Sequence, residues 1–150
     1  MSKVKSLACA LALTVAAWPL VRPAASPRCV PSNRFVVLRG GLVRDTLTKL
    51  VWQQQASSTP MTRASAQAYC PSGFRLPAIK ELSSLVDLTV ISGPKIDQIA
   101  FPGTPAEPFW TSTQHAGTSS VNPSVWHVDF NDGGSFPDNG GGFYRARCVR

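Results

Sequence analysis

The stretch SVWHVDFNDGGSF, residues 124–136, limits the possible folds of this chain more than any other segment. Apolar and polar side chains alternate along its first half, in the order Trp126, His127, Val128, Asp129 and Phe130. Alternation with a period of two predicts a strand with one buried face. Residues 131–134, NDGG, then supply the chemistry of a tight turn. The stretch therefore predicts an antiparallel β-hairpin.

Further strand patterns lie at both ends of the chain and enclose two helix patterns. The expected strands are RFVVL (34–38), LVRDTLTKLVWQQ (42–54, broken by a turn at Asp45-Thr46), PFWTSTQ (108–114) and FYRARCVR (143–150). The first helix is expected over 58–70, with Thr59 as its cap and Pro60 in its first position. The second is expected to start at Pro77, and its apolar face is formed by Ile79, Leu82, Leu85 and Val86.

A proline- and glycine-rich stretch, residues 92–108, predicts a long structured loop between the helices and the last strands. The order of strands, helices, loop and strands predicts an α+β domain with a largely antiparallel sheet and two flanking helices.

The N-terminal residues have the layout of a secretory signal peptide. Lys3 and Lys5 precede an apolar run, LACALALTVAAWPL, which is short for a membrane span. We expect a signal peptide over 1–25, a linker over 26–33 and one domain over 34–150, in a periplasmic or secreted protein with no membrane span after cleavage. The net charge of +7 falls to +4 once Lys3, Lys5 and Arg22 are removed, which favours anionic partners without requiring them.

Three cysteines remain after removal of the signal peptide: Cys29, Cys70 and Cys148. An exported chain meets an oxidising compartment, so one disulfide and one odd cysteine are expected, and spacing alone leaves all three pairings open. No C-x-x-C occurs, which argues against a zinc ribbon or a thioredoxin-type centre.

Basic residues cluster near both ends of the predicted domain: Arg34, Arg39, Arg44 and Lys49, then Arg145, Arg147 and Arg150. If the first and last strands lie together, these residues form one cationic patch, and we take Arg39 and Arg145 as candidate ligand-binding residues. Arginine binds sulfate and carboxylate groups through paired hydrogen bonds. The alternative is ordinary surface charge with structural ion pairs. Nucleic acid is not expected as a partner, because an exported chain without a basic run lacks its electrostatic signature.

The hairpin carries a second set of candidate ligand-binding residues: His127, Asp129, Asn131 and Asp132. Their oxygen donors favour calcium if a metal binds, but the full EF-hand loop is absent, and a hairpin turn accounts for the same residues. No G-x-S-x-G elbow occurs, and no catalytic residues and no cofactor are assigned.

Several pieces, taken in order, resemble the Lcl C-terminal domain family, which is named for a bacterial collagen-like adhesin. They are RFVVLRGGLVRDTLTKLVWQQ, ASAQAYC, GFRLPAIKELSSLVD, IDQIAFPGT, FWTST, VWHVDFNDG and RCVR. The resemblance implies a C-type-lectin-like fold similar to that of formylglycine-generating enzymes, in which the N- and C-terminal strands meet. It also implies a Cys70–Cys148 disulfide. Its signature positions are Trp52, Leu76, Pro77, Glu81, Leu82, Phe101, Trp110, Phe130 and Arg147.

This chain departs from the family pattern at two places. Phe74 stands where tryptophan is common, and Lys49 stands where glycine is common. The resemblance carries over neither calcium-dependent sugar binding nor oxidase chemistry. The expected function is a non-enzymatic recognition module for a glycan, an anionic polysaccharide or an envelope protein. An enzyme or calcium-binding protein centred on His127 and Asp129, and a purely structural envelope protein, are the alternatives.

Overall fold

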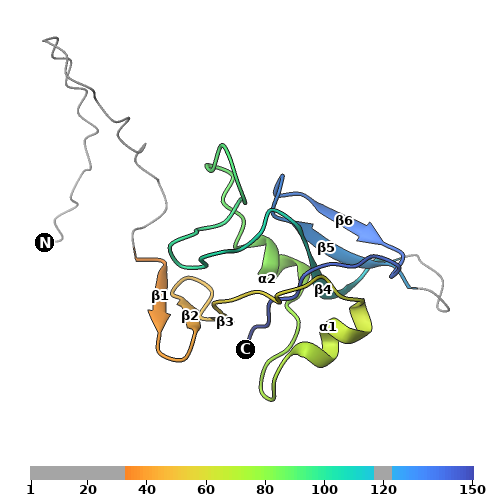
Figure 1. The fold of residues 1–150 in the computed structure, drawn as a ribbon, viewed down its shortest axis with the longest axis horizontal. Helices are drawn as coiled ribbons and strands as arrows, with labels where there is room; N and C mark the ends of the chain where they lie inside the picture. The colour runs from red at the N-terminus through yellow and green to blue at the C-terminus, as the bar shows by residue number, and fades with distance from the viewer. Residues whose placement is uncertain (1–32, 117–122) are drawn as a thin grey trace, which may run out of the picture.

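A computed structural model describes residues 33–116 and 123–150, and these residues form an α+β domain (Figure 1). The predicted signal peptide and nearly all of the predicted linker lie outside the described residues. Two three-stranded antiparallel sheets are present, one built from the start of the domain and one from its second half. Within the described ranges, no helix is long and apolar enough to cross a membrane.

The first sheet is a meander of β1 (Phe35–Leu38), β2 (Leu42–Asp45) and β3 (Val51–Gln53). Gly40 and Gly41 connect β1 to β2 with φ angles of 77° and 69°, a conformation that residues with a Cβ rarely adopt. The predicted turn after β2 is present, and Asp45 Oδ1 accepts the Leu47 N–H at 2.9 Å. Lys49 has a φ of 66°, which explains why glycine is favoured at this position.

The second sheet consists of β4 (Pro108–Gln114), β5 (Val125–Asp129) and β6 (Ser135–Asp138). β5 and β6 are the two strands of the predicted hairpin, and their register pairs His127 with Phe136. β4 pairs with the other edge of β5, and Phe109 lies opposite Val128. The prediction of one largely antiparallel sheet was therefore correct about strand direction, but the strands divide into two sheets.

Both helices are shorter than the sequence predicts. α1 (Arg63–Tyr69) is capped by Thr62, whose hydroxyl accepts the Ser65 N–H, so the predicted cap at Thr59 was wrong. Two backbone hydrogen bonds to Tyr144 hold Met61 extended, which prevents the helix from starting earlier. α2 (Ile79–Ser83) starts after its N-cap residue Ala78. Pro77 therefore precedes the helix, whereas it was predicted to be its first residue.

The start of α2 is held by a charged side chain from within the helix. The Glu81 carboxylate accepts the Ala78 N–H at 2.7 Å and binds the Arg75 guanidinium through two contacts of 2.7 Å. The carboxylate therefore satisfies the backbone N–H of Ala78 itself, which is the half of a capping box that the N3 side chain supplies. The buried residues Leu82 and Leu85 confirm the predicted apolar face.

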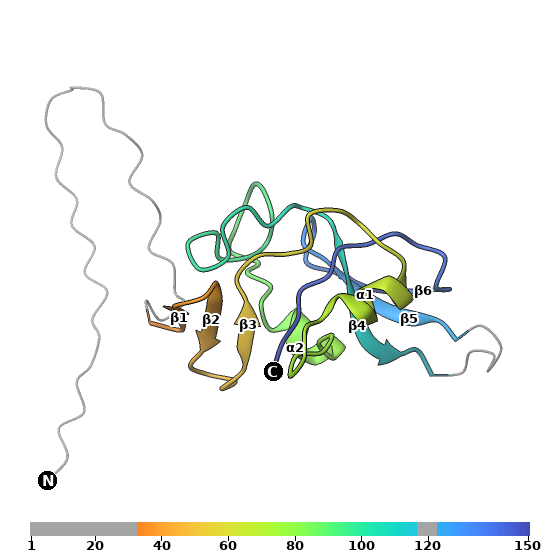
Figure 2. The same ribbon diagram turned by 60° about the horizontal axis from the view of Figure 1, so that its bottom comes forward.

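The C-terminal segment is not the continuous strand that was predicted. It forms single bridges to several elements: Tyr144 to Met61, Arg145 to Phe109, and Val149 to both Trp52 and Arg75. The chain end lies beside β3 (Figure 2). β2 and β3 separate it from β1, so the first and last strands do not pair, contrary to the expectation. The Cys70–Cys148 disulfide joins this segment to the end of α1 and confirms the implied pairing.

The core lies between the two sheets and the loop before β4. Trp52, Leu82, Phe101, Phe109 and Phe130 are all fully buried there. A second cluster surrounds Trp110, whose indole N–H donates to the Met61 carbonyl at 2.8 Å. Most of the signature positions are thus buried.

Arg147 is a fully buried cation within this core. Its guanidinium donates to the carbonyls of Gln53 and Gln54 and to the Thr104 hydroxyl, and it lies 4.7 Å from the centre of the Phe101 ring. Burial lowers the pKa of Arg147 to about 9. The contacts of this arginine are internal, and its role is to connect β3 to the long loop.

Candidate functional site on the first sheet

The basic residues at the two ends of the domain do not form a single surface patch. Arg145 binds Glu107 at 2.7 Å and donates to the Ser57 carbonyl at 3.0 Å, and Arg34 binds Asp45 at 2.7 Å. Arg147 is buried. Three of the seven basic residues in these clusters therefore make contacts within the domain. The guanidinium of Arg145, a candidate ligand-binding residue, is already bound to Glu107 and Ser57.

The hairpin candidates mostly shape their own turn. Asp129 Oδ1 accepts the Asn131 N–H at 2.8 Å, and Asp132 Oδ1 accepts the Gly134 N–H at 2.7 Å. Across residues 33–116 and 123–150, no three His, Cys, Asp or Glu side chains lie close enough together to hold a metal ion. Calcium binding at this turn stays a prediction.

His127 lies in a buried aromatic cluster and not at the surface of the hairpin. Its ring is 4.6 Å from Tyr144 and 5.9 Å from Phe136. Burial lowers the pKa of His127, although Asp138, Asp129 and Asp132 act in the opposite direction. The Tyr144 hydroxyl donates to Asp138 at 2.8 Å, and burial together with this bond raises the pKa of Tyr144 to about 12. Burial therefore disfavours the charged form of both rings.

Cations that form no ion pair with a described residue lie on or beside the face of the first sheet that points away from the core, here called the outer face. Val43 and Trp52 point into the core, so their neighbours Arg44 and Val51, which oppose each other in the register, point outward. Val51 exchanges two backbone hydrogen bonds with Arg150, which places Arg150 in the same cross-strand row. Arg39 lies at the exposed turn between β1 and β2.

A hollow of about 480 Å³ opens at this face. Its lining includes the glycine turn at Gly40 and Gly41, two glutamines and two aromatic residues: Gln53, Gln55, Tyr69 and Phe74. Tyr69 is 39% exposed, and the Arg150 guanidinium lies 4.8 Å from the centre of the Phe74 ring. The hollow thus combines aromatic faces with amide groups, and an arginine stacks on one of the aromatic rings that line it.

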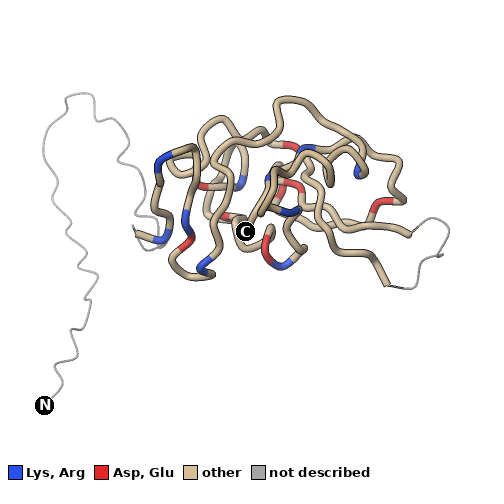
Figure 3. Tube along the Cα trace, turned by 90° about the horizontal axis from the view of Figure 1, so that it is seen from below, with Lys and Arg blue, Asp and Glu red and all other residues tan. Residues whose placement is uncertain are grey.

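The charged residues at this face are all basic. Arg39, Arg44 and Arg150 form no ion pair with any described residue, and no acidic residue lines the hollow. Asp45 is buried on the opposite face of the sheet, and Glu81 is paired with Arg75. Figure 3 shows the basic positions along the first strands. The outer face can therefore attract an anionic ligand.

Only part of this face could be predicted from the sequence. Arg39 was a predicted ligand-binding residue, and Arg44 and Arg150 belonged to the basic clusters at the two ends of the predicted domain. The alternation around Val43 contains enough information to point Arg44 outward. Tyr69 and the two glutamines were missed because they come together only in the fold: the disulfide ties the end of α1 to Cys148, whose carbonyl accepts the Gln53 N–H.

Comparison with known proteins supports the resemblance of this sequence to the Lcl C-terminal domain family. The family model of the Lcl C-terminal domain matches residues 41–150, which is most of the chain. No curated protein and no solved structure matches the chain significantly. The chain belongs to the Lcl C-terminal domain family.

Proposed function

We propose that this domain is a non-enzymatic recognition module that binds an anionic polysaccharide through the outer face of the first sheet. The observation that carries the proposal is a hollow with no acidic residue among its described lining, next to three cations of the outer face. Arg39 directly precedes the lining residue Gly40, Arg44 lies two positions along β2 from the lining residue Leu42, and the Arg150 guanidinium stacks on the lining residue Phe74. Adjacent strands lie about 4.8 Å apart, so Arg44 and Arg150, two strands from each other, are separated by roughly 10 Å at the backbone. Cations at this spacing can contact successive charged groups along one chain.

The remaining residues of the hollow suit sugars in particular. Tyr69 and Phe74 offer apolar ring faces, and the amides of Gln53 and Gln55 carry both donors and acceptors for hydroxyl groups. Arginine binds sulfate and carboxylate groups through two parallel hydrogen bonds. A small uncharged ligand would use the aromatic and amide groups but would leave the cations without partners.

We also propose an exported location and a C-type-lectin-like fold. The expected signal peptide and the Cys70–Cys148 disulfide both suit an oxidising compartment. The family membership, the two antiparallel sheets and the long loop before β4 support the fold assignment. The same proposal includes an adhesive role for the domain in the cell envelope.

Retention on a heparin column tests the polysaccharide proposal. The double variant Arg44→Gln/Arg150→Gln should elute at clearly lower salt than the unchanged protein, because both charges contact the polyanion. Lys80→Gln is the control, since Lys80 is an exposed cation on α2. Tyr69→Ala should weaken binding with little change in its salt dependence.

Two results would overturn the proposal. One is elution of the unchanged protein at low salt. The other is a double variant that is retained as strongly as the Lys80→Gln control. Thermal unfolding of each variant must stay close to that of the unchanged protein, because Arg150 also stacks on Phe74.

A further inference from the structure

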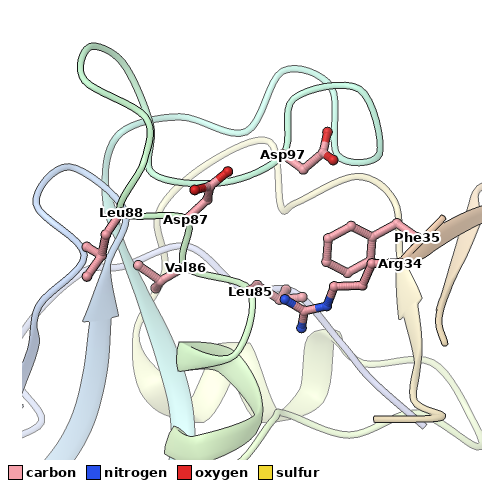
Figure 4. A pocket seen from close by; sticks show the side chains of 7 residues that line it. All are labelled: Arg34, Phe35, Leu85, Val86, Asp87, Leu88 and Asp97. Carbon is pink, nitrogen blue, oxygen red and sulfur yellow. The ribbon is translucent and has the colours of Figure 1, made fainter. Parts of the chain in front are cut away.

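A second hollow, of about 240 Å³, lies on the opposite side of the first sheet (Figure 4). Phe35, Leu85 and Val86 form its apolar part, and Phe35 packs against the main core. Phe35 alternates with Val36, which opposes Arg44, so this hollow and the arginines of the outer face lie on different faces of the sheet. A ligand held here is independent of the proposed polysaccharide site.

Exposed apolar side chains occur in the two loops that contribute Leu88 and Asp97 to this hollow. Leu88, which lines it, is 74% exposed. Ile91 in the same loop is 95% exposed, and Ile99, two residues after the lining residue Asp97, is 83% exposed. Single exposed apolar residues are common, but several in the loops that form one hollow are typical of a protein interaction surface.

Two carboxylates give this surface a charge preference. Asp87 and Asp97 line the hollow, and each uses Oδ1 to accept backbone N–H groups, from Thr89 at 2.9 Å and from Ile99 at 2.8 Å. Neither Oδ2 has a hydrogen bond or ion pair within the described residues. Both carboxylates belong to the upper rim of the hollow in Figure 4.

Arg34 is the one cation among the described residues that line the hollow, and its charge is already balanced by Asp45. Its guanidinium binds both oxygens of Asp45, at 3.2 and 2.7 Å, and donates to the Ser84 carbonyl at 2.8 Å. The two rim carboxylates therefore remain without a counter-charge, and a cationic ligand with apolar neighbours fits the hollow.

We propose that this hollow and its rim bind a partner protein, which inserts one basic side chain between Asp87 and Asp97. Apolar residues on either side of that basic side chain pack on Leu88, Ile91 and Ile99. The size supports this choice, because sites for drug-sized molecules occupy about 300–1,000 Å³ and this hollow is smaller. The long aliphatic stem of arginine or lysine covers the apolar floor while its charged end reaches the rim.

A capped tripeptide, acetyl-Leu-Arg-Leu-amide, serves as the probe in an NMR titration of the labelled protein. Amide shifts are expected around Asp87, Leu88 and Ile99. The matched peptide with citrulline in place of arginine keeps the shape but lacks the charge, and we expect it to bind at least about tenfold more weakly. Such a difference is ordinary for loss of one paired charge.

The double variant Asp87→Asn/Asp97→Asn should lose binding of the arginine peptide to the same extent. Asparagine keeps the Oδ1 acceptor, so both loops retain the backbone hydrogen bonds that hold them. Asp132→Asn is the matched control, because Asp132 also accepts a backbone N–H, from Gly134, but in the β5–β6 turn. Heparin retention of the double variant should not fall below that of the control.

Equal binding of the citrulline peptide would overturn the proposal, as would unchanged binding by the double variant. Shifts confined to the outer face of the first sheet would overturn it too. If the same amides shift with protein concentration in the absence of peptide, the occupant is a second copy of this chain, and the assignment to a different partner protein is wrong.

Discussion

Removal of the Cys70–Cys148 disulfide is expected to cost this domain a large part of its stability. The bond joins residues 78 positions apart and so closes a long loop in the unfolded chain. In the chain-entropy model, a loop of this length corresponds to about 4.5 kcal/mol at 25 °C. Domains of this size have unfolding free energies of about 5–15 kcal/mol, so the loss is a third of the total or more.

The perturbation is the double variant Cys70→Ala/Cys148→Ala. Alanine is preferable to serine here, because Cys148 is fully buried and a hydroxyl would need a new hydrogen-bond partner. With an unfolding entropy of about 2.1 cal/mol/K per residue, the loss corresponds to a fall in Tm of roughly 20 °C.

Urea unfolding followed by tryptophan fluorescence measures the effect, since Trp52 and Trp110 are buried. Both proteins should carry Cys29→Ala, so that the odd cysteine cannot exchange with the pair. The slope of the unfolding free energy against urea should rise in the double variant, because its unfolded chain exposes more surface. A loss below about 1 kcal/mol with an unchanged slope would refute the reasoning.

Two further predictions concern buried polar groups. Arg147→Met keeps the side-chain length but leaves the Gln53 and Gln54 carbonyls without their donor. The free energy of unfolding in the same urea assay should fall by about 2–5 kcal/mol. Equal or greater stability would mean that burial of the charge costs more than its hydrogen bonds contribute. Because burial lowers the pKa of His127 below its usual 6.5, the unfolded state takes up a proton before the folded state does as the pH falls through this value. The free energy of unfolding should therefore decrease from pH 7.5 toward pH 5.5, by at most about 1.4 kcal/mol per pH unit, and His127→Gln should flatten this part of the profile. The carboxylates with lowered pKa values, such as Asp45 and Glu81, lose their contributions to stability only in more acidic solution. If His127→Gln shows the same slope of unfolding free energy against pH as the unchanged protein, the histidine is not the cause.

The local elements of this fold could be predicted because each depends on residues that are neighbours in sequence. The β5–β6 hairpin follows from alternation and a turn of suitable residues, and the turn after β2 follows from the side chain of Asp45. The buried face of α2 follows from apolar spacing. The chemistry of these stretches is complete within a few residues, so no distant contact was needed to predict them.

Element boundaries and the use of each charge depended on distant contacts. Met61 is held extended by Tyr144, which delays the start of α1. Glu107, which is 38 positions away, occupies the guanidinium of Arg145, whereas Arg44 and Arg150 have no ion pair with any described residue. The sequence by itself determined the family and the local elements, and the family resemblance in turn implied the disulfide partners. Only the tertiary structure decided which arginines are available to a ligand, because a charge is free or neutralised according to the groups that folding brings beside it.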